Sequence, residues 1–312
     1  MSEPALLSIV TPCFNEEENV DELYRRINAA IADLKIYRFE FIFIDNASKD
    51  GTVAKLKQLA RDDPRVKIIV NTRNFGHICS PYYGIMQSSG LATIYLASDL
   101  QDPPELIPEF VRHWEAGYKL VMATKPVSQG HALTHALRRA YYYFLNKISD
   151  ISLLSDSTGF GLYDKEVLDH LRKIEDPYPY LRGLVCELGY EIKTIEFIQP
   201  RRLRGLSKNN FYSLYDIAML GVVSHSKVPI RFVAFLGFVF GLMSVLAAVI
   251  FLALKLMFWE SFPIGIAPTI IGIFFLFGVQ LFFIGVIGEY IGSIHTYVQR
   301  RPIVVEKERI NF

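Results

Sequence analysis

The sequence has few cysteines and almost no excess of charge of either sign. Its three cysteines, Cys13, Cys79 and Cys186, are far apart and odd in number, so they support neither a disulfide framework nor a thiolate metal site. A reducing compartment is the simplest inference. The formal net charge of +1 argues against a nucleic-acid-binding protein, because such proteins normally carry a strongly basic surface. We therefore expect no nucleic-acid partner.

Two sequence patterns that would indicate other classes of protein are also missing. The N-terminus lacks the basic stretch and apolar core of a secretory signal peptide, so we expect no cleavable leader. Dinucleotide-dependent dehydrogenases carry G-x-G-x-x-G after their first strand, whereas here Pro12 is followed by Cys13, Phe14, Asn15 and Glu16. The sequence therefore does not predict a dehydrogenase.

Apolar runs alternate with segments of helical spacing in the first hundred residues. The runs cover residues 6–11, 39–44, 66–70 and 92–97, and the helical segments include residues 17–35 and 52–61. This alternation predicts a parallel sheet with right-handed crossovers. The fold class that we expect is α/β, with a Rossmann-like and mostly parallel sheet. Because ligands bind at the carboxyl ends of such strands, Thr11-Pro12, Asp45-Asn46 and Asp99 are expected along one edge.

The fourth apolar run ends in a polar segment with Asp99, Gln101 and Asp102, followed by two prolines. Two carboxylates and an amide oxygen without a neighbouring Cys or His suit a hard cation such as Mg²⁺ or Mn²⁺. Alternatively, Asp102 only caps the next helix, with Pro103 at its first position. The residues alone leave both interpretations open.

Two long segments near the C-terminus contain no charged residue. They cover residues 232–254 and 262–288, and each exceeds the roughly 20 residues that span a bilayer core. We predict two transmembrane helices within residues 230–292, at about 232–254 and 266–288. An interfacial amphipathic helix at residues 209–229 is expected before them, and a C-terminal tail at residues 293–312 after them.

Cations flank the outer ends of the two segments, whereas their connection at residues 255–261 is nearly neutral. The positive-inside rule then places both termini and the N-terminal domain, residues 1–208, in the cytoplasm. We expect a multi-pass protein of the cell membrane. A homo-oligomer stays open, since glycines in both predicted helices could allow close packing.

Five motifs together resemble those of the polyprenyl-phosphate glycosyltransferases, the inverting GT-A family that includes dolichyl-phosphate mannose synthase and the bacterial bactoprenol glucosyltransferases. The resemblance covers nearly the whole chain. It rests on Thr11-Pro12-x-x-Asn15-Glu16, Asp45-Asn46-x-Ser48-x-Asp50-Gly51-Thr52, Asp99-Leu100-Gln101-Asp102-Pro103-Pro104-Glu105, Arg202-x-x-Gly205-x-Ser207-Lys208, and Gly288-Glu289-Tyr290-Ile291-Gly292 with Arg301-Pro302.

The resemblance implies a GT-A fold and metal-assisted, inverting transfer of a sugar from a nucleotide sugar to a polyprenyl phosphate. UDP-glucose and undecaprenyl phosphate are the expected substrates, and a GDP-mannose-dependent mannose synthase is the alternative. The cofactor would be Mg²⁺ or Mn²⁺. By position, Asp99 and Asp156 would act in catalysis, Asp99 and Gln101 would bind the metal, and two further groups would bind the substrates. These are Thr11, Pro12, Asn15, Glu16, Asp45 and Asn46 for the donor, and Arg139, Arg202, Ser207 and Lys208 for the acceptor phosphate.

The sequence departs from the motifs of that family at several positions. Ala97 stands where D-x-D begins, Gly159 and Gly161 replace the second Asp and the Arg of D-x-G-D-F-R-L, and Tyr143 stands where bacterial members often have Arg. These losses leave open a catalytically inactive membrane scaffold. A processive polysaccharide synthase is disfavoured, because neither tryptophan lies in a Q-x-x-R-W motif.

Overall fold

The computed structural model describes residues 4–125, 154, 157–200, 226, 228–258 and 266–312. The chain divides into two compact units. One consists of residues 1–146, 151–214 and 300–312, and the other of residues 147–150 and 215–299. The acceptor residues Arg139, Arg202, Ser207 and Lys208 and the catalytic candidate Asp156 lie outside the described residues, so their predicted roles stay predictions.

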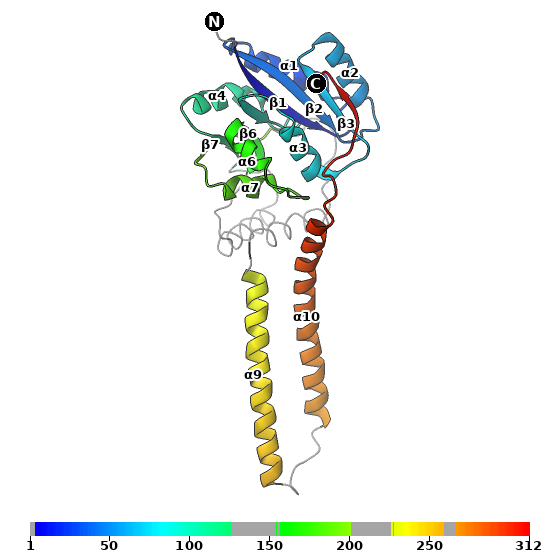
Figure 1. Cartoon of the computed structure of the whole chain (residues 1–312), viewed down its shortest axis with the longest axis vertical. Coiled ribbons are helices and arrows are strands. Elements are labelled where there is room, and N and C mark those ends of the chain that lie inside the picture. The colour runs from blue at the N-terminus through cyan, green and yellow to red at the C-terminus, as the bar shows by residue number, and fades with distance from the viewer. Residues whose placement is uncertain (1–3, 126–153, 155–156, 201–225, 227, 259–265) are drawn as a thin grey trace. The chain divides into compact units, whose positions relative to one another are not determined.

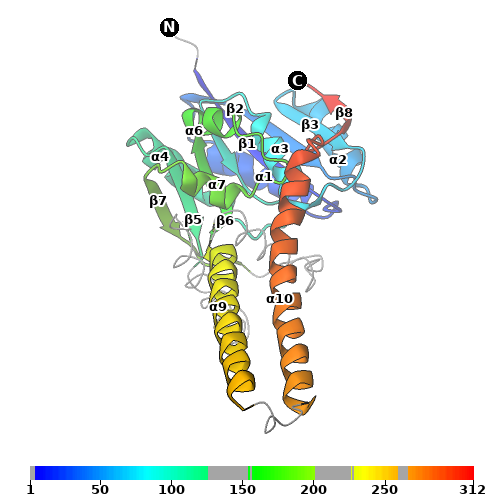
Figure 2. The ribbon, with the colours of Figure 1, turned by 60° about the horizontal axis from the view of Figure 1, so that its bottom comes forward.

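The first unit is built on one sheet, which has eight strands within the described residues, in the order β7-β5-β6-β4-β1-β2-β3-β8 (Figures 1 and 2). Strands β4, β1, β2 and β3 are parallel neighbours, and β5 is parallel to β7. β6 runs antiparallel between β4 and β5, and β8 runs antiparallel to β3. The predicted α/β fold with a mostly parallel sheet is confirmed. The strands are β1 (Ala5–Cys13), β2 (Tyr37–Asp45), β3 (Val66–Asn71), β4 (Ala92–Tyr95), β5 (Leu120–Thr124), β6 (Ser157–Asp164), β7 (Ile192–Glu196) and β8 (Glu306–Ile310).

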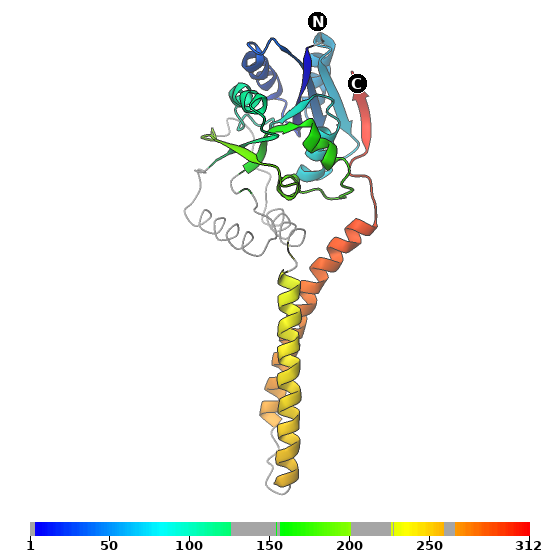
Figure 3. The same cartoon turned by 60° about the vertical axis from the view of Figure 1, so that its left-hand side comes forward.

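Helices cover both faces of this sheet, which explains why the central strands are continuously apolar. Successive side chains of a strand point to opposite faces, so Phe41 and Phe43 of β2 pack into one layer, and Ile42 and Ile44 pack into the other. Figure 3 shows the dark-blue α1 and the teal α4 together on one side of the sheet. That layer contains α1 (Val20–Ile31), α2 (Thr52–Asp62) and α4 (Ile107–Glu115), and the other contains α3 (Gly76–Met86), α6 (Lys165–Leu171) and α7 (Leu181–Glu187).

The last strand comes from the segment that we expected to be a tail. β8 lies along β3, with Ile310 opposite Ile68 and Glu306 opposite Asn71. The backbone N–H of Thr72 donates to the Val305 carbonyl at 3.0 Å, which continues the pairing past the end of β3. Residues 300–312 therefore belong to the same compact unit as the N-terminal domain.

The second unit contains two long helices, α9 (Val228–Met257) and α10 (Ile266–Val298). Within it, the Tyr290 hydroxyl donates to the Ser226 carbonyl at 2.8 Å. In the described part of the chain, one segment, Phe275–Val298, is long and apolar enough to cross a membrane, and the apolar segment Val228–Ser244 is shorter. The transmembrane hairpin, the interfacial helix and the topology stay predictions.

Candidate functional site

Three loops at the carboxyl edge of the sheet contain a residue in the left-handed backbone conformation. Asn15 follows β1 with φ 56°, Ala47 follows β2 with φ 61°, and Leu100 lies in the loop after β4 with φ 61°. Such values are uncommon for residues other than glycine and cluster at ligand-binding and active sites. Three of the five non-glycine residues with positive φ among the described residues therefore lie at the predicted site edge, and the other two, Arg300 and Asn311, lie near the C-terminus.

The loops after β1 and β2 are hydrogen-bonded to one another. The Asn15 N–H donates to Ser48 Oγ at 2.8 Å, and the Lys49 N–H donates to Asn15 Oδ1 at 2.8 Å. The Glu16 N–H donates to Thr52 Oγ1 at 2.9 Å. Asn15 thus joins two loops with its side chain, and its predicted contact with the donor gains no support from these bonds. Pro12 and Glu16 lie half-buried at the same edge.

Thr11 and Asp45 each bury an oxygen that has no hydrogen-bond partner among the described residues. Thr11 is 1% exposed and Asp45 is fully buried. Asp45 Oδ2 accepts from the Ser48 N–H at 2.9 Å, but Asp45 Oδ1 and Thr11 Oγ1 are unpaired. Burial raises the pKa of the Asp45 carboxyl above its usual range. An unsatisfied buried oxygen costs about 1–3 kcal/mol, so these atoms are expected to bind a ligand that donates to them.

Asn46 organises a loop that the sequence analysis missed, at residues 71–76 after β3. Its Nδ2 donates to Asn74 Oδ1 at 2.9 Å and to the Gly76 carbonyl at 3.0 Å. Its Oδ1 accepts from Asn71 Nδ2 at 3.1 Å and from the Phe75 N–H at 2.8 Å. Asn46, predicted to bind the donor, therefore has its side chain occupied in holding this loop. The sequence signal that could have indicated this loop is the group Asn71, Asn74 and Gly76 at the end of the third strand and just after it.

We expect Asn46→Ala to weaken donor binding by loosening this loop. The substitution leaves Asn71 Nδ2 and the Phe75 N–H without one acceptor, so about 1–3 kcal/mol of stability should be lost. Calorimetry with UDP and a thermal melt measure the two effects. Asn28→Ala is the matched control, because Asn28 also uses both ends of its amide, toward the Tyr24 carbonyl and Arg65, outside the site. Equal donor affinity in both variants would contradict a role of the loop in the site.

The loop after β4 presents Asp99 and Gln101. The Gln101 N–H donates to Asp99 Oδ1 at 3.2 Å, and Gln101 Nε2 lies 3.4 Å from the Pro200 carbonyl, to which it donates. The amide nitrogen is thereby turned toward Pro200, so Oε1 is the side-chain atom that could bind a cation. Pro200 directly precedes the cation-rich segment Arg201 to Lys208 in the sequence.

Asp102 does not cap the following helix. It is 3% exposed, and its Oδ2 accepts from the backbone N–H of Ala97 at 3.0 Å, which closes the loop on itself. The next helical turn is a 3-10 helix at Pro104–Leu106, which begins without a side-chain cap. Burial raises the pKa of the Asp102 carboxyl to about 6. Asp102 is therefore a structural residue that shapes the loop carrying Asp99.

The donor set at this loop fits a divalent cation that also binds a substrate. In the described residues, no three His, Cys, Asp or Glu side chains are grouped to hold a metal ion. Mg²⁺, however, commonly uses one or two carboxylates and takes its other ligands from substrate phosphates and water. Asp99 and Gln101 suit that mode of binding and do not suit a site made by the protein alone.

The two glycines that interrupt the expected D-x-G-D-F-R-L motif have a structural explanation. Gly159 has φ +93°, a conformation that side chains rarely adopt. A Cβ at Gly161 would lie 2.3 Å from the Val121 carbonyl oxygen, so no side chain fits there. On this backbone a side chain would be strained at Gly159 and would clash with the neighbouring strand at Gly161.

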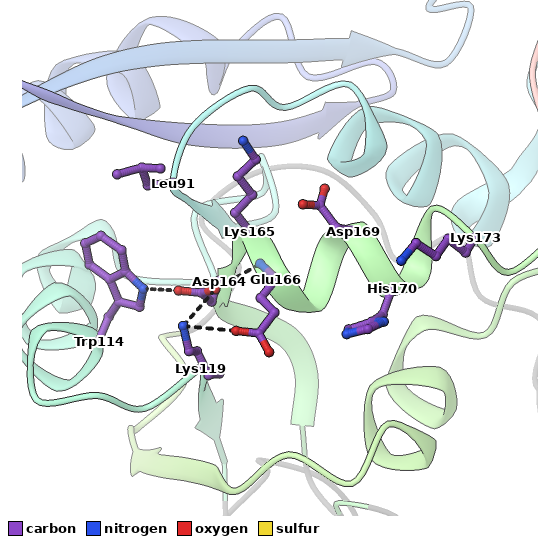
Figure 4. A pocket seen from close by; sticks show the side chains of 9 residues that line it. All are labelled: Leu91, Trp114, Lys119, Asp164, Lys165, Glu166, Asp169, His170 and Lys173. Atoms are coloured by element: carbon purple, nitrogen blue, oxygen red, sulfur yellow. Dashed lines mark hydrogen bonds and ion pairs between the residues drawn. The ribbon is translucent and has the colours of Figure 1, made fainter.

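A pocket at the other edge of the sheet contains none of the predicted site residues. Figure 4 shows its lining, with Trp114 Nε1 donating to Asp164 Oδ2 at 2.6 Å and Lys119 3.3 Å from Asp164 Oδ1 and 3.4 Å from Glu166. Asp164 is the last residue of the antiparallel strand β6, which places the pocket at the amino edge of the parallel strands. Its central carboxylate is already paired, so we assign it no part in the site.

Comparison with known proteins identifies the family. Residues 8–172, more than half of the chain, match Glycosyl transferase family 2. An uncharacterised glycosyltransferase of Synechocystis sp. is 34% identical over 298 residues, which cover 95% of this chain and 93% of that protein. The SfII prophage-derived bactoprenol glucosyl transferase of Shigella flexneri is 32% identical over 311 residues, with 97% of both chains covered. A prophage bactoprenol glucosyl transferase homolog of Escherichia coli K12 is 30% identical over 309 residues, covering 96% of this chain and 98% of its own. The chain therefore belongs to glycosyl transferase family 2 and is a glycosyltransferase with a GT-A-like fold.

Proposed function

We propose that this enzyme transfers glucose from UDP-glucose to undecaprenyl phosphate. The observation that carries the proposal is the bond between Gln101, in the loop suited to a metal and a diphosphate, and Pro200, which directly precedes the cation-rich segment 201–208. This bond connects the loop proposed to bind the donor with the residue that directly precedes the predicted acceptor-binding segment. The names of the Shigella and E. coli relatives support glucose as the sugar and a polyprenyl phosphate as the acceptor.

In this proposal the nucleoside binds over the ends of β1 and β2. Asp45 Oδ1 accepts a hydrogen bond from an N–H or O–H of the nucleoside, and Thr11 Oγ1 exchanges one with it, which satisfies both unpaired oxygens. Pro12 and Glu16 border the same position. Asn15 and Asn46 hold the loops around it.

Asp99 and Gln101 hold Mg²⁺ or Mn²⁺ against the donor diphosphate. When bound, the ion neutralises the charge that develops on the leaving diphosphate. Asp99 has a second role in the protein itself, since it accepts the backbone N–H of Gln101 and so holds the turn of the loop that carries Gln101.

The acceptor phosphate is positioned by Arg139, Arg202, Ser207 and Lys208, and it attacks the anomeric carbon in line with the leaving group, which inverts the configuration. A phosphate monoester has a second pKa of about 6, so it is already mostly dianionic at neutral pH. The reaction then needs positioning and charge screening more than a strong general base. Gly159, which replaces the second carboxylate of the motif, is compatible with this chemistry, and Asp156 is the residual carboxylate of the motif.

The long helices α9 and α10 anchor the enzyme in the cell membrane, with the catalytic domain and both termini in the cytoplasm. The acceptor headgroup then lies at the membrane surface, where the sequence predicts an interfacial helix at residues 209–229.

The division between donor and acceptor residues can be tested with Arg202→Ala and Lys208→Ala. Each variant should lose about tenfold to a hundredfold in kcat/KM for polyprenyl phosphate, because a charge-assisted hydrogen bond contributes about 1.5–3 kcal/mol. UDP affinity measured by calorimetry should be nearly unchanged. Arg204→Ala is the control, since it removes a charge from the same segment outside the motif.

A screen of UDP- and GDP-sugars with polyprenyl phosphate in nanodiscs decides the substrates. Transfer from GDP-mannose and none from UDP-glucose would replace the proposed donor. If Arg202→Ala and Lys208→Ala lose UDP affinity and keep normal acceptor kinetics, these cations bind the nucleotide diphosphate and the division is wrong.

A further inference from the structure

Arg182 is a half-buried cation at the carboxyl edge of the sheet that neither the motifs nor the proposed function use. It lies in the first turn of α7. Its Nη1 donates to the Ser157 carbonyl at 3.0 Å, and its guanidinium carbon lies 5.9 Å from the centre of the Tyr180 ring. Ser157 is the first residue of β6 and lies opposite Thr124, the last residue of β5, so Arg182 is held at the carboxyl edge of the sheet beside the end of β5.

Arg182 has no anionic partner among the described residues, where a backbone carbonyl and an aromatic ring are its contacts. Other arginines of the same domain are paired with carboxylates, such as Arg26 with Glu105 at 2.7 Å and Arg172 with Asp169 at 2.6 Å. A partly buried charge is normally paired, because removing it from water is costly. A guanidinium also has five N–H donors in a planar fork that matches phosphate oxygens. The missing partner of Arg182 is therefore expected to be an anion.

The charge of Arg182 acts on two residues at this edge of the sheet. Burial, and after it the charge of Arg182, lowers the pKa of His77, which lies in the first turn of α3 directly after the loop held by Asn46. Burial raises the pKa of Tyr95, the last residue of β4, and Arg182 opposes that rise. Lys125, a second cation at this edge, donates to Gln199 Oε1 at 3.0 Å.

We propose that Arg182 binds phosphate oxygens during glycosyl transfer. Two phosphates meet at this edge in the proposed function, on which this inference rests: the diphosphate of the donor and the phosphate of the acceptor. Arg182 is held against the first residue of β6, at the same edge of the sheet as the loops that carry Asn46 and Asp99. It supplies there the positive charge that Gly161, in the same strand, has no room to carry.

The test compares Arg182→Gln and Arg182→Lys in the full-length enzyme. Gln keeps an N–H that can donate to the Ser157 carbonyl but removes the charge, and Lys keeps the charge without the fork. Binding of UDP with Mn²⁺ is measured by calorimetry, and kcat/KM is measured for undecaprenyl phosphate. Arg182→Gln should lose about tenfold to a hundredfold in one of the two quantities, and Arg182→Lys should recover part of the loss. Loss of UDP affinity assigns Arg182 to the diphosphate, and loss of acceptor kcat/KM alone assigns it to the acceptor.

Arg172→Met is the matched control for lost hydrogen bonds to backbone. Arg172 donates to the Met86 and Ser88 carbonyls at 3.2 and 2.7 Å. That variant should lower the melting temperature and leave both ligand measurements unchanged.

If Arg182→Gln behaves in the same way, or if Arg182→Lys is no better than Arg182→Gln in both measurements, the inference is overturned. If Arg182→Gln does not fold, Arg182→Lys decides alone, since a phosphate contact predicts a ligand defect at normal stability. A wild-type enzyme that binds UDP but does not use polyprenyl phosphate would contradict the proposed function and leave the UDP measurement on Arg182 valid.

Discussion

Asp99→Ala should reduce glycosyl transfer by about 10³-fold or more, because the loop has no second solvent-accessible carboxylate to replace this half-buried one. Asp102 cannot take its place, since it is 3% exposed and bound to the Ala97 N–H. Loss of Asp99 also removes the acceptor for the backbone N–H of Gln101, which should loosen the loop that carries the other proposed metal ligand. We expect metal-dependent UDP binding to fall together with turnover.

The measurement is single-turnover transfer at saturating UDP-glucose, with a titration of Mn²⁺ in the same samples. Asp99→Asn keeps the size of the side chain and tests whether its charge is required. Asp62→Ala removes an exposed carboxylate of α2 that accepts from Gln58, and it should leave both measurements unchanged. Turnover of Asp99→Ala within tenfold of the wild type would show that the metal is held elsewhere.

Deletion of residues 306–312 should destabilise the catalytic domain although none of them lies among the predicted site residues. The deletion removes the backbone pairing of β8 with β3, the 2.6 Å ion pair between Lys57 and Glu308, and the two bonds of 2.9 Å from Asn311 Nδ2 to the Ala60 and Val66 carbonyls. At about 1 kcal/mol for each lost bond, the three side-chain interactions alone amount to ~3 kcal/mol, which corresponds to roughly 6–12 °C in Tm. The exposed edge of β3 should also promote aggregation.

Thermal melts and light scattering of the detergent-solubilised protein measure these effects. Lys307→Ala changes one exposed residue of β8 and should behave as the wild type. Asn311→Ala should produce an intermediate loss, since it removes two of the bonds and keeps the strand. A truncated protein with unchanged Tm would mean that β8 adds no stability to the sheet. The same reasoning predicts that a fragment of residues 1–208 is a poor substitute for the catalytic domain.

The four central parallel strands could be predicted from the sequence because they are buried on both faces. A run such as Phe41 to Ile44 is apolar at every position, and this pattern survives whatever packs against it. The predicted order of strands and helices also indicated which edge of the sheet carries the polar loops. Thr11, Asp45 and Asp99 lie at or just after the ends of their strands, as expected. Their contacts were not predictable in the same way. Asn15 and Asn46 are polar residues in the right loops, but what their amides bond depends on the loops they meet.

β8 and Arg182 could not be predicted because their positions are set by distant partners. β8 reads Glu306-Lys307-Glu308-Arg309-Ile310, a charged stretch without strand periodicity, and it forms a strand because β3 offers an open edge. Arg182 is one arginine on a short helix. Nothing in the sequence distinguishes it, and only the structure shows its bond to Ser157 and the lack of a carboxylate among its described contacts. Asp102 was open to two interpretations for a similar reason, since its partner is the backbone N–H of Ala97 and sequence patterns do not report such bonds.

The position of β8 also fixes the order in which the sheet can be completed during synthesis. Lys57 and Glu308, which form an ion pair in the folded domain, are 251 residues apart, and both long helices are encoded between them. During synthesis on the ribosome, the outer edge of β3 therefore stays unpaired until the two apolar helices have been translated. If insertion of the helices into the membrane is delayed, that edge is exposed for longer. Strand pairing between neighbouring nascent chains would then compete with correct folding.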